Sequence, residues 1–125
     1  MIKQVRWVGS SREDLSAFPE EVRQEAGYSI YLAQRGELAP HAVPMVGFGG
    51  ANVIEVVMNH DGNAYRAVYT VRFAEAVYVL HAFQKKSHKG RSTPVRHLSL
   101  IKHRLKAAEQ DYQTLYGSET REKRR

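Results

Sequence analysis

Residues 53–85 read VIEVVMNHDGNAYRAVYTVRFAEAVYVLHAFQK. This stretch holds three runs rich in β-branched and aromatic residues, a composition typical of strands. The runs span 53–58, 64–73 and 76–83. The pair Asp61-Gly62 separates the first two runs and readily adopts the positive φ angles of a tight hairpin, and a short link at 74–75 joins the second run to the third. The stretch therefore predicts a three-stranded antiparallel meander.

The segment before the meander predicts one strand and two helices. Residues 3–8 alternate between polar and apolar, as a half-buried strand does. Ser10 and Glu13 have the spacing of a capping box, in which the two side chains bond free amides at a helix start, and they predict a short helix. Pro19 and Gly36 then bound a second helix, whose apolar residues recur every three or four positions.

The segments around the meander differ in regularity. Residues 37–50 contain two prolines and three glycines, which predicts an irregular connection. After the meander comes a basic loop at 84–92, and Thr93 and Pro94 then predict the cap and first turn of a long amphipathic helix. We therefore expect an α+β fold: a strand, two helices, the meander and a C-terminal helix.

The size and composition of the chain are those of one domain. It has 125 residues, 42% of them hydrophobic, and we expect a folded domain at 1–117 followed by a charged, disordered tail at 118–125. Its apolar runs are far shorter than the roughly 20 residues that cross a bilayer, and its start does not resemble a signal peptide. It contains no cysteine, which fits a reducing compartment. The sequence thus favours a cytoplasmic protein without membrane contact.

Positive charge is concentrated in one part of the chain. The net charge is +6, which favours polyanionic partners. Residues 81–106 include eight lysines or arginines, four histidines and no acidic residue. Five acidic residues gather instead within 13–25. One region of the molecule is therefore expected to attract phosphate.

Strand alternation selects two arginines. Arg66 and Arg72 lie on one face of the second strand of the meander, opposite an apolar face. Guanidinium groups bind phosphate in a bidentate manner, so this face is a candidate platform for RNA, with Glu55 placed to pair with Arg66. The alternative is that both arginines are ordinary solvent-facing charges.

The third strand leads into the basic loop through Lys85 and Lys86. Two ammonium groups at a strand end can stabilise the charge that grows on phosphoryl oxygens during RNA cleavage, although surface lysines of no special role are the alternative. His88 follows in the loop, where a pKa of about 6.5 suits acid–base chemistry. His81 is expected to be packed within its strand. Further candidates for RNA contact are Arg72, Lys89, Arg91 and Arg96. No metal-ligand spacing or cofactor motif is present, so neither a metal nor a cofactor is predicted.

Three motifs follow one another in the second half of the chain: YRAVY at 65–69, VYVLHAFQKKS at 77–87 and Thr93-Pro94. Together they resemble the core signature of phage-derived Gp49-like proteins, the HigB branch of the RelE toxin superfamily. The resemblance extends back through WVGSS at 7–11 and FPEEVR at 18–23, and forward into 101–105. It therefore covers nearly everything except the tail.

The resemblance implies a RelE-like domain with a twisted antiparallel sheet and two N-terminal helices on one face. It also implies a toxin of a type II toxin–antitoxin system, a metal-independent endoribonuclease, or mRNA interferase, that cuts messenger RNA on the ribosome and so inhibits translation. By their place in the motif, Arg66, Lys85 and Lys86 are implied as phosphate-binding and catalytic groups, with Arg72 as a weaker addition. The implied partner is a helix-turn-helix antitoxin, through which the pair binds operator DNA.

Two questions stay open at the level of sequence. Some RelE relatives have a C-terminal catalytic tyrosine, whereas Tyr112 and Tyr116 lie on what the pattern predicts to be a packed helix, so the general base is unassigned. The alternative function is a non-catalytic module of phage origin that binds RNA or the antitoxin without cutting. A DNA-binding regulator is disfavoured because the basic segment has no groove-reading motif.

Overall fold

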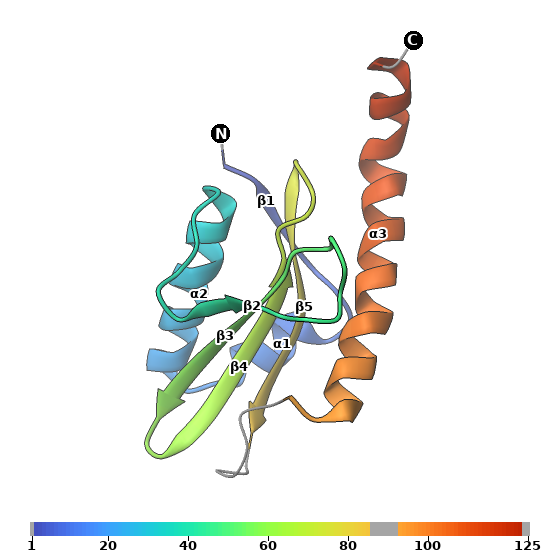
Figure 1. The fold of residues 1–125 in the computed structure, drawn as a ribbon. Coiled ribbons are helices and arrows are strands. Elements are labelled where there is room, and N and C mark those ends of the chain that lie inside the picture. The colour runs from blue at the N-terminus through green and yellow to red at the C-terminus, as the bar shows by residue number, and fades with distance from the viewer. Residues whose placement is uncertain (1, 86–92, 124–125) are drawn as a thin grey trace.

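One mixed β-sheet of five strands forms the centre of the computed structural model, which describes residues 2–85 and 93–123 (Figure 1). The strand order is β1-β5-β4-β3-β2. Helices cover both faces of this sheet (Figure 1). The fold is therefore α+β, as the sequence predicts.

The three predicted strands are neighbours in this sheet. They are β3 (Val53–His60), β4 (Asn63–Thr70) and β5 (Ala76–Lys85), and each pairs antiparallel with the next. The turn between β3 and β4 consists of Asp61 and Gly62 with φ angles of 50° and 78°, which confirms the predicted hairpin. The register between β4 and β5 shifts at Val68 and Tyr69, where β5 carries a bulge.

Two further strands extend the sheet beyond a simple meander. β1 (Gln4–Trp7) pairs with β5 in parallel, and β2 (Ala42–Pro44) pairs antiparallel with β3. β2 lies inside the segment predicted to be an irregular connection, and that prediction is wrong for these three residues. A strand this short has no alternation to detect, and a proline is tolerated there because β2 is at the edge of the sheet. The sheet is thus mixed and five-stranded.

Helices α1 (Ser11–Ser16) and α2 (Glu20–Gln34) pack on one face of the sheet (Figure 1). Pro19 precedes α2 as its N-cap, and the amides of Gly36 and Glu37 close its last turn in a Schellman motif, with φ +80° at Gly36. The predicted bounds of α2 are therefore confirmed. The predicted capping box of α1 is wrong, because the Ser10 hydroxyl donates to the Asp14 carboxylate instead of capping an amide.

Helix α3 (Val95–Lys123) covers the opposite face and runs past the end of the sheet (Figure 1). Thr93 does not cap it as predicted, because Pro94 directly precedes the helix and the Thr93 hydroxyl bonds Glu55 and Arg66. The helix continues into the predicted tail, and the division of the chain at residue 117 remains a prediction. Within the described residues, no helix combines the length and apolar composition needed to cross a membrane.

Each face of the sheet has its own apolar core. Val22, Ile30 and Ala67 belong to the core beneath α1 and α2. Val68 and Ile101 belong to the core beneath α3. Adjacent residues of β4 thus face different cores, and both faces of the sheet are buried. Any charged side chain on the α3 face must consequently be enclosed or lie at its margin.

Candidate functional site

A buried ion pair joins the sheet to the segment just before α3. Arg66 Nη1 on β4 lies 2.9 Å from Glu55 Oε1 on β3, and the two side chains are 6% and 9% exposed. The Thr93 hydroxyl donates to Glu55 Oε2 at 2.7 Å and accepts from Arg66 Nη1 at 3.3 Å. The predicted pairing of Glu55 with Arg66 is confirmed, and it fixes the start of α3 on the sheet.

The predicted open platform of Arg66 and Arg72 is not formed. Arg66 is buried, with Glu55 and Thr93 bonded to its guanidinium, although strand alternation suggested that its face was open to solvent. Arg72 follows β4 and pairs with Glu109 Oε2 at 3.0 Å. Glu109 lies 14 residues after Val95, which is about 20 Å along an α-helix. Arg72 is therefore separated from the other candidate residues.

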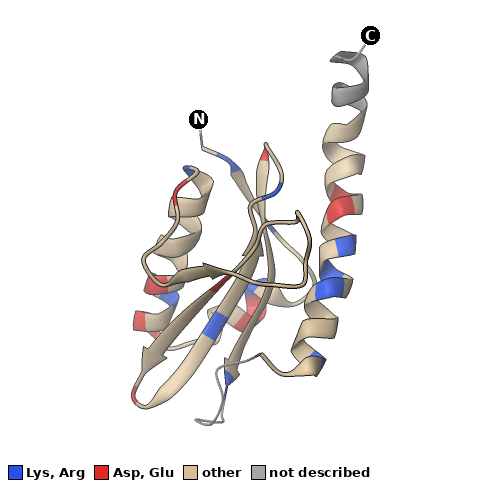
Figure 2. Cartoon of the chain, in the orientation of Figure 1, with Lys and Arg blue, Asp and Glu red and all other residues tan. Residues whose placement is uncertain are grey.

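The end of β5 and the first half of α3 bring basic groups together (Figure 2). Lys85, the last residue of β5, is described and is 8% exposed. Arg96 lies in the first turn of α3 and is exposed. Four other candidates lie outside the described residues and remain predictions: Lys86, His88, Lys89 and Arg91.

Two histidines meet beside these cations. His81 Nε2 on β5 lies 2.8 Å from His97 Nδ1 on α3. The Phe83 ring stacks on His97, with ring centroids 3.9 Å apart, and also on His81 at 4.8 Å. His81 is buried, as predicted, and His97 is partly exposed. The pair therefore connects the interior of the molecule to its surface.

Arg104 contacts His81, the buried member of this pair. Its Nη1 donates to the Leu80 carbonyl at 3.0 Å and lies 3.4 Å from His81 Nδ1, while its Nη2 donates to the Ser10 hydroxyl at 3.1 Å. The guanidinium also packs on Gly9, where an added Cβ would lie 2.9 Å from Arg104 Nε. Gly9 has φ +56°, so both backbone conformation and space favour glycine there.

Both imidazoles are neutral at pH 7. Burial lowers the pKa of His81 to about 4, and the neighbouring positive charge of Arg104 acts in the same direction. Burial also lowers the pKa of His97, and the charge of Arg96 adds to this effect. Each ring consequently carries a single N–H.

A groove of about 650 Å³ opens beside the histidine pair. Its lining includes His81 and Phe83 of β5, Tyr65 of β4, and Phe18 from the corner between α1 and α2. Aromatic side chains are typical of sites for single-stranded nucleic acid, whose bases stack on them. Among the described residues that line the groove, the one carboxylate is Asp14 and none is a lysine or arginine. The groove therefore offers stacking surfaces, while the positive charges lie outside it.

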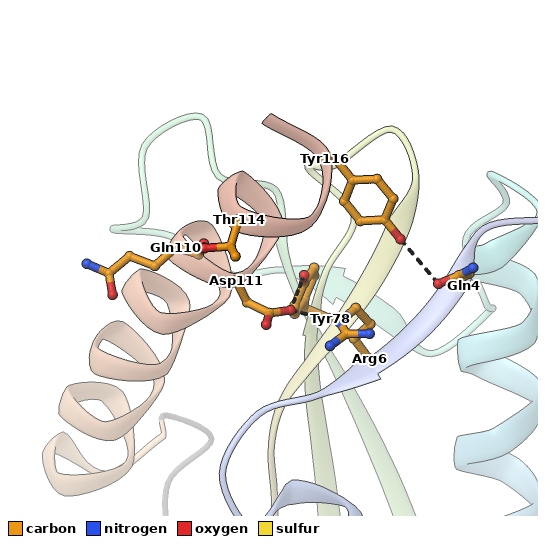
Figure 3. Close-up of polar contacts among 7 residues, drawn as sticks. All are labelled: Gln4, Arg6, Tyr78, Gln110, Asp111, Thr114 and Tyr116. Atoms are coloured by element: carbon orange, nitrogen blue, oxygen red, sulfur yellow. Dashed lines mark hydrogen bonds and ion pairs between the residues drawn. The ribbon is translucent and has the colours of Figure 1, made fainter. Parts of the chain in front are cut away.

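Further along α3, a different set of side chains attaches the second half of the helix to the sheet (Figure 3). Asp111 accepts hydrogen bonds from Arg6 Nε at 2.7 Å and from the Tyr78 hydroxyl at 2.6 Å. The Tyr78 hydrogen bond lowers the pKa of Asp111, and the Arg6 guanidinium adds to this. The Tyr116 hydroxyl donates to Gln4 Oε1 at 3.2 Å. These contacts link α3 to β1 and β5.

The sequence predictions assigned no role to His97 or Arg104. A usable signal was present, because alternation along β5 from residue 81 places His81, Phe83 and Lys85 on one face, which is the face that α3 covers. What periodicity could not reveal is which turn of α3 lies opposite His81. Among the described residues, no group of three or more histidine or carboxylate side chains is placed to hold a metal ion.

Comparison with known proteins gives one match. The family model described as "Phage derived protein Gp49-like (DUF891)" matches residues 13–106, which include the Glu55–Arg66 pair, both histidines and Arg104. Neither the curated proteins nor the solved structures contain a significant match to this chain.

Proposed function

Because the chain belongs to the Gp49-like family of phage-derived proteins, a RelE/HigB-like toxin family, we propose that it is the toxin of a type II toxin–antitoxin system. Its proposed activity is cleavage of messenger RNA on the ribosome, which inhibits translation. The observation that carries this proposal is that the family match spans the basic and imidazole groups gathered at the β5–α3 junction.

The chemistry requires a nucleophile, stabilisation of charge and protonation of a leaving group. The 2′-hydroxyl of the RNA attacks the adjacent phosphorus, the bond to the 5′ oxygen breaks, and the products are a cyclic phosphate and a 5′-hydroxyl. Lys85, Lys86 and Arg96 are the proposed cations for the phosphate, and His88 is the proposed acid–base group. Arg66 is compensated by Glu55, so its proposed role is to hold the start of α3 in place.

A helix-turn-helix antitoxin is the proposed partner. The net charge of +6 suits a partner that contributes acidic residues, and operator DNA would be reached only through that antitoxin. Co-expression with a helix-turn-helix protein from the neighbouring reading frame tests this part: we expect the two chains to purify as one complex and growth to be restored.

The nuclease is tested by induced expression in a bacterial host. The wild type is compared with Lys85→Ala/Lys86→Ala and with a control that removes two exposed charges from the middle of α3, Lys102→Ala/Lys106→Ala. We expect growth arrest and new internal 5′ ends in messenger RNA for the wild type and the control, and neither for the Lys85/Lys86 variant. Far-UV circular dichroism melts of the purified variants show whether each is folded, which matters because Lys85 is buried.

A second candidate function gives different results in the same experiment. A binding module of phage origin would leave growth and transcripts unchanged even when the wild type is folded and abundant. That outcome would refute the nuclease. Capture of RNA or of the antitoxin by the same preparation would then establish the binding module.

A further inference from the structure

Four side chains form a continuous chain of contacts from the interior to the surface at the start of α3. Arg104 lies beside His81, His81 contacts His97, and His97 lies beside Arg96. The three nitrogen–nitrogen distances along this chain are 3.4, 2.8 and 3.5 Å. The central contact is a short hydrogen bond, so it needs one donor and one acceptor.

The inner end determines which nitrogen of each ring carries the proton. A guanidinium can only donate, so His81 Nδ1, which faces Arg104, has to be the unprotonated nitrogen. The single proton of neutral His81 is then on Nε2 and is donated to His97 Nδ1. The proton of neutral His97 is consequently on Nε2. Arg104 cannot turn away from His81 without losing its bonds to Leu80 and Ser10.

The outer end places two donors against each other. Arg96 Nε–H is directed at His97 Nε2 across 3.5 Å, as it would be toward an acceptor, and 3.5 Å is at the outer limit of a hydrogen bond. The anchored Arg104 has already assigned a proton to that nitrogen, whereas the exposed Arg96 is free to turn, so both groups at the outer end are donors. Within the described residues, neither group has an oxygen acceptor. Two convergent donors of this kind are both satisfied when one oxygen anion contacts them.

We propose that Arg96 and His97 form a subsite for one phosphate of an RNA chain, in which neutral His97 donates a hydrogen bond through Nε2. This inference rests on the proposed function, because it assigns a phosphate contact within the same site. His97 is then a phosphate-binding residue and not the general base, since its only outward nitrogen carries a proton. His81 and Arg104 are positioning residues that act through it.

The surroundings favour an anion at this point. Arg96 and His97 lie in the first turn of a helix of 29 residues, where the helix dipole disfavours cations, and that turn has no acidic residue. A bound phosphate would offset the unfavourable interaction between the Arg96 charge and the helix dipole. The adjoining groove, with His81, Phe83 and Tyr65 in its lining, gives space for the nucleotides on either side. These features favour a nucleic acid phosphate over the carboxylate of a protein partner.

Nuclear magnetic resonance of the full-length chain tests the proposal without any need for catalysis. Long-range proton–nitrogen correlation at pH 7 shows which nitrogen of each imidazole is protonated. The protein is then titrated with a short oligonucleotide that has 2′-deoxyribose throughout and cannot be cleaved by its own 2′-hydroxyl. We expect protonation at Nε2 of both rings, and a shift of the His97 signals on binding.

Four variants measure the contribution of each donor to the dissociation constant. Arg96→Gln and His97→Phe are expected to weaken binding by about tenfold, the effect of one lost charge-assisted contact. His97→Phe keeps a ring against Phe83 but has no donor, whereas His97→Gln keeps a donor and should bind more tightly than His97→Phe. Arg23→Gln, an exposed arginine on α2, is the matched control and should leave binding unchanged.

Three results would overturn the subsite. They are a His97 proton on Nδ1, oligonucleotide affinity that is equal in wild type and Arg96→Gln, and His97 signals that respond to an acidic peptide but not to the oligonucleotide. The last result would assign the two donors to a protein partner. Failure of the nuclease alone looks different, because RNA would then remain intact while the binding and tautomer results still hold.

Discussion

The part of α3 that contacts the sheet, from His97 to Tyr116, has opposite charge arrangements at its N-terminal and C-terminal ends. At the C-terminal end, each arginine of the sheet meets a carboxylate of the helix, in Arg72–Glu109 at 3.0 Å and Arg6–Asp111 at 2.7 Å. At the N-terminal end, the helix itself contributes the arginines, and Arg104 binds a carbonyl and a hydroxyl. No carboxylate pairs with Arg96 or Arg104 among the described residues.

This difference indicates that one part of α3 attaches the helix to the sheet and that the other part belongs to the candidate site. Compensated charges at the C-terminal end hold the helix in place and leave little electrostatic potential. Uncompensated cations at the N-terminal end keep a positive potential that a polyanion can neutralise. The buried Glu55–Arg66 pair lies near the N-terminal end of α3. Its two charges neutralise each other, so it serves to attach the helix to the sheet.

The largest expected effect comes from removing a carboxylate at each end in turn. Glu55→Ala removes the carboxylate that pairs with the buried Arg66 guanidinium, and we expect a loss of roughly 3–5 kcal/mol in the free energy of unfolding. Glu109→Ala breaks a pair whose side chains are 45% and 39% exposed, so its expected loss is below about 1 kcal/mol. Urea denaturation measures both, and equal losses would contradict the contrast between the two ends.

A glycine pair tests the position of Arg104. Gly9→Ala forces a side chain into a left-handed conformation, which costs about 1–2 kcal/mol, and also displaces the Arg104 guanidinium. Gly36→Ala also places a side chain at a positive φ, +80°, but has no neighbouring atom within 4 Å of the new Cβ. We expect thermal melts to show the greater destabilisation for Gly9→Ala. Gly9→Ala should change the nuclear magnetic resonance signals of the His81 imidazole, whereas Gly36→Ala should not. His81 signals in Gly9→Ala that match those of the wild type would show that Arg104 does not set the tautomer of His81.

The two ends should lose stability in different pH ranges. His81 has a folded-state pKa of about 4, below its ordinary value of 6.5, so the unfolded chain binds more protons and stability falls as pH decreases from 6.5 to 4. Asp111 has a lowered folded-state pKa, so its contribution persists above its ordinary value of 3.8 and is lost at lower pH.

Urea unfolding of the wild type, His81→Asn and Asp111→Asn across pH 3 to 8 separates these ranges. We expect His81→Asn to flatten the stability profile between pH 6.5 and 4. Asp111→Asn should lower stability modestly near neutral pH, because its side chain is 41% exposed, and should match the wild type in acid. A flat wild-type profile between pH 6.5 and 4 would show that His81 is not buried in its neutral form.

The smallest effect is expected on the opposite face of the sheet. Tyr69 is fully buried there, and its hydroxyl has no hydrogen-bond partner among the described residues. Tyr69→Phe removes this unsatisfied group, so we expect stability to stay within about 1 kcal/mol of the wild type or to rise. A larger loss in urea unfolding would reveal a partner for the hydroxyl and would extend the polar attachment to the α2 face.

Several local features followed from the sequence alone. Asp61-Gly62 predicted the hairpin because few residue pairs tolerate its positive φ angles, and Pro19 and Gly36 predicted the bounds of α2 because they fit helix ends. The motifs at 65–69 and 77–87 predicted the family, and the pairing of Glu55 with Arg66 followed from strand alternation. These features depend on a few adjacent residues or on a fixed period.

Only the tertiary structure decided how far each charge is exposed and which distant groups meet. Arg66 is buried against Glu55 and against Thr93, which follows 27 residues later in the chain. His81 meets His97 because of where α3 starts and how β5 bulges. Strand β2 exists only through its pairing with β3. Periodicity specifies which face of an element is apolar or polar, but packing between layers determines what covers that face, and the proposed phosphate subsite is a product of that packing.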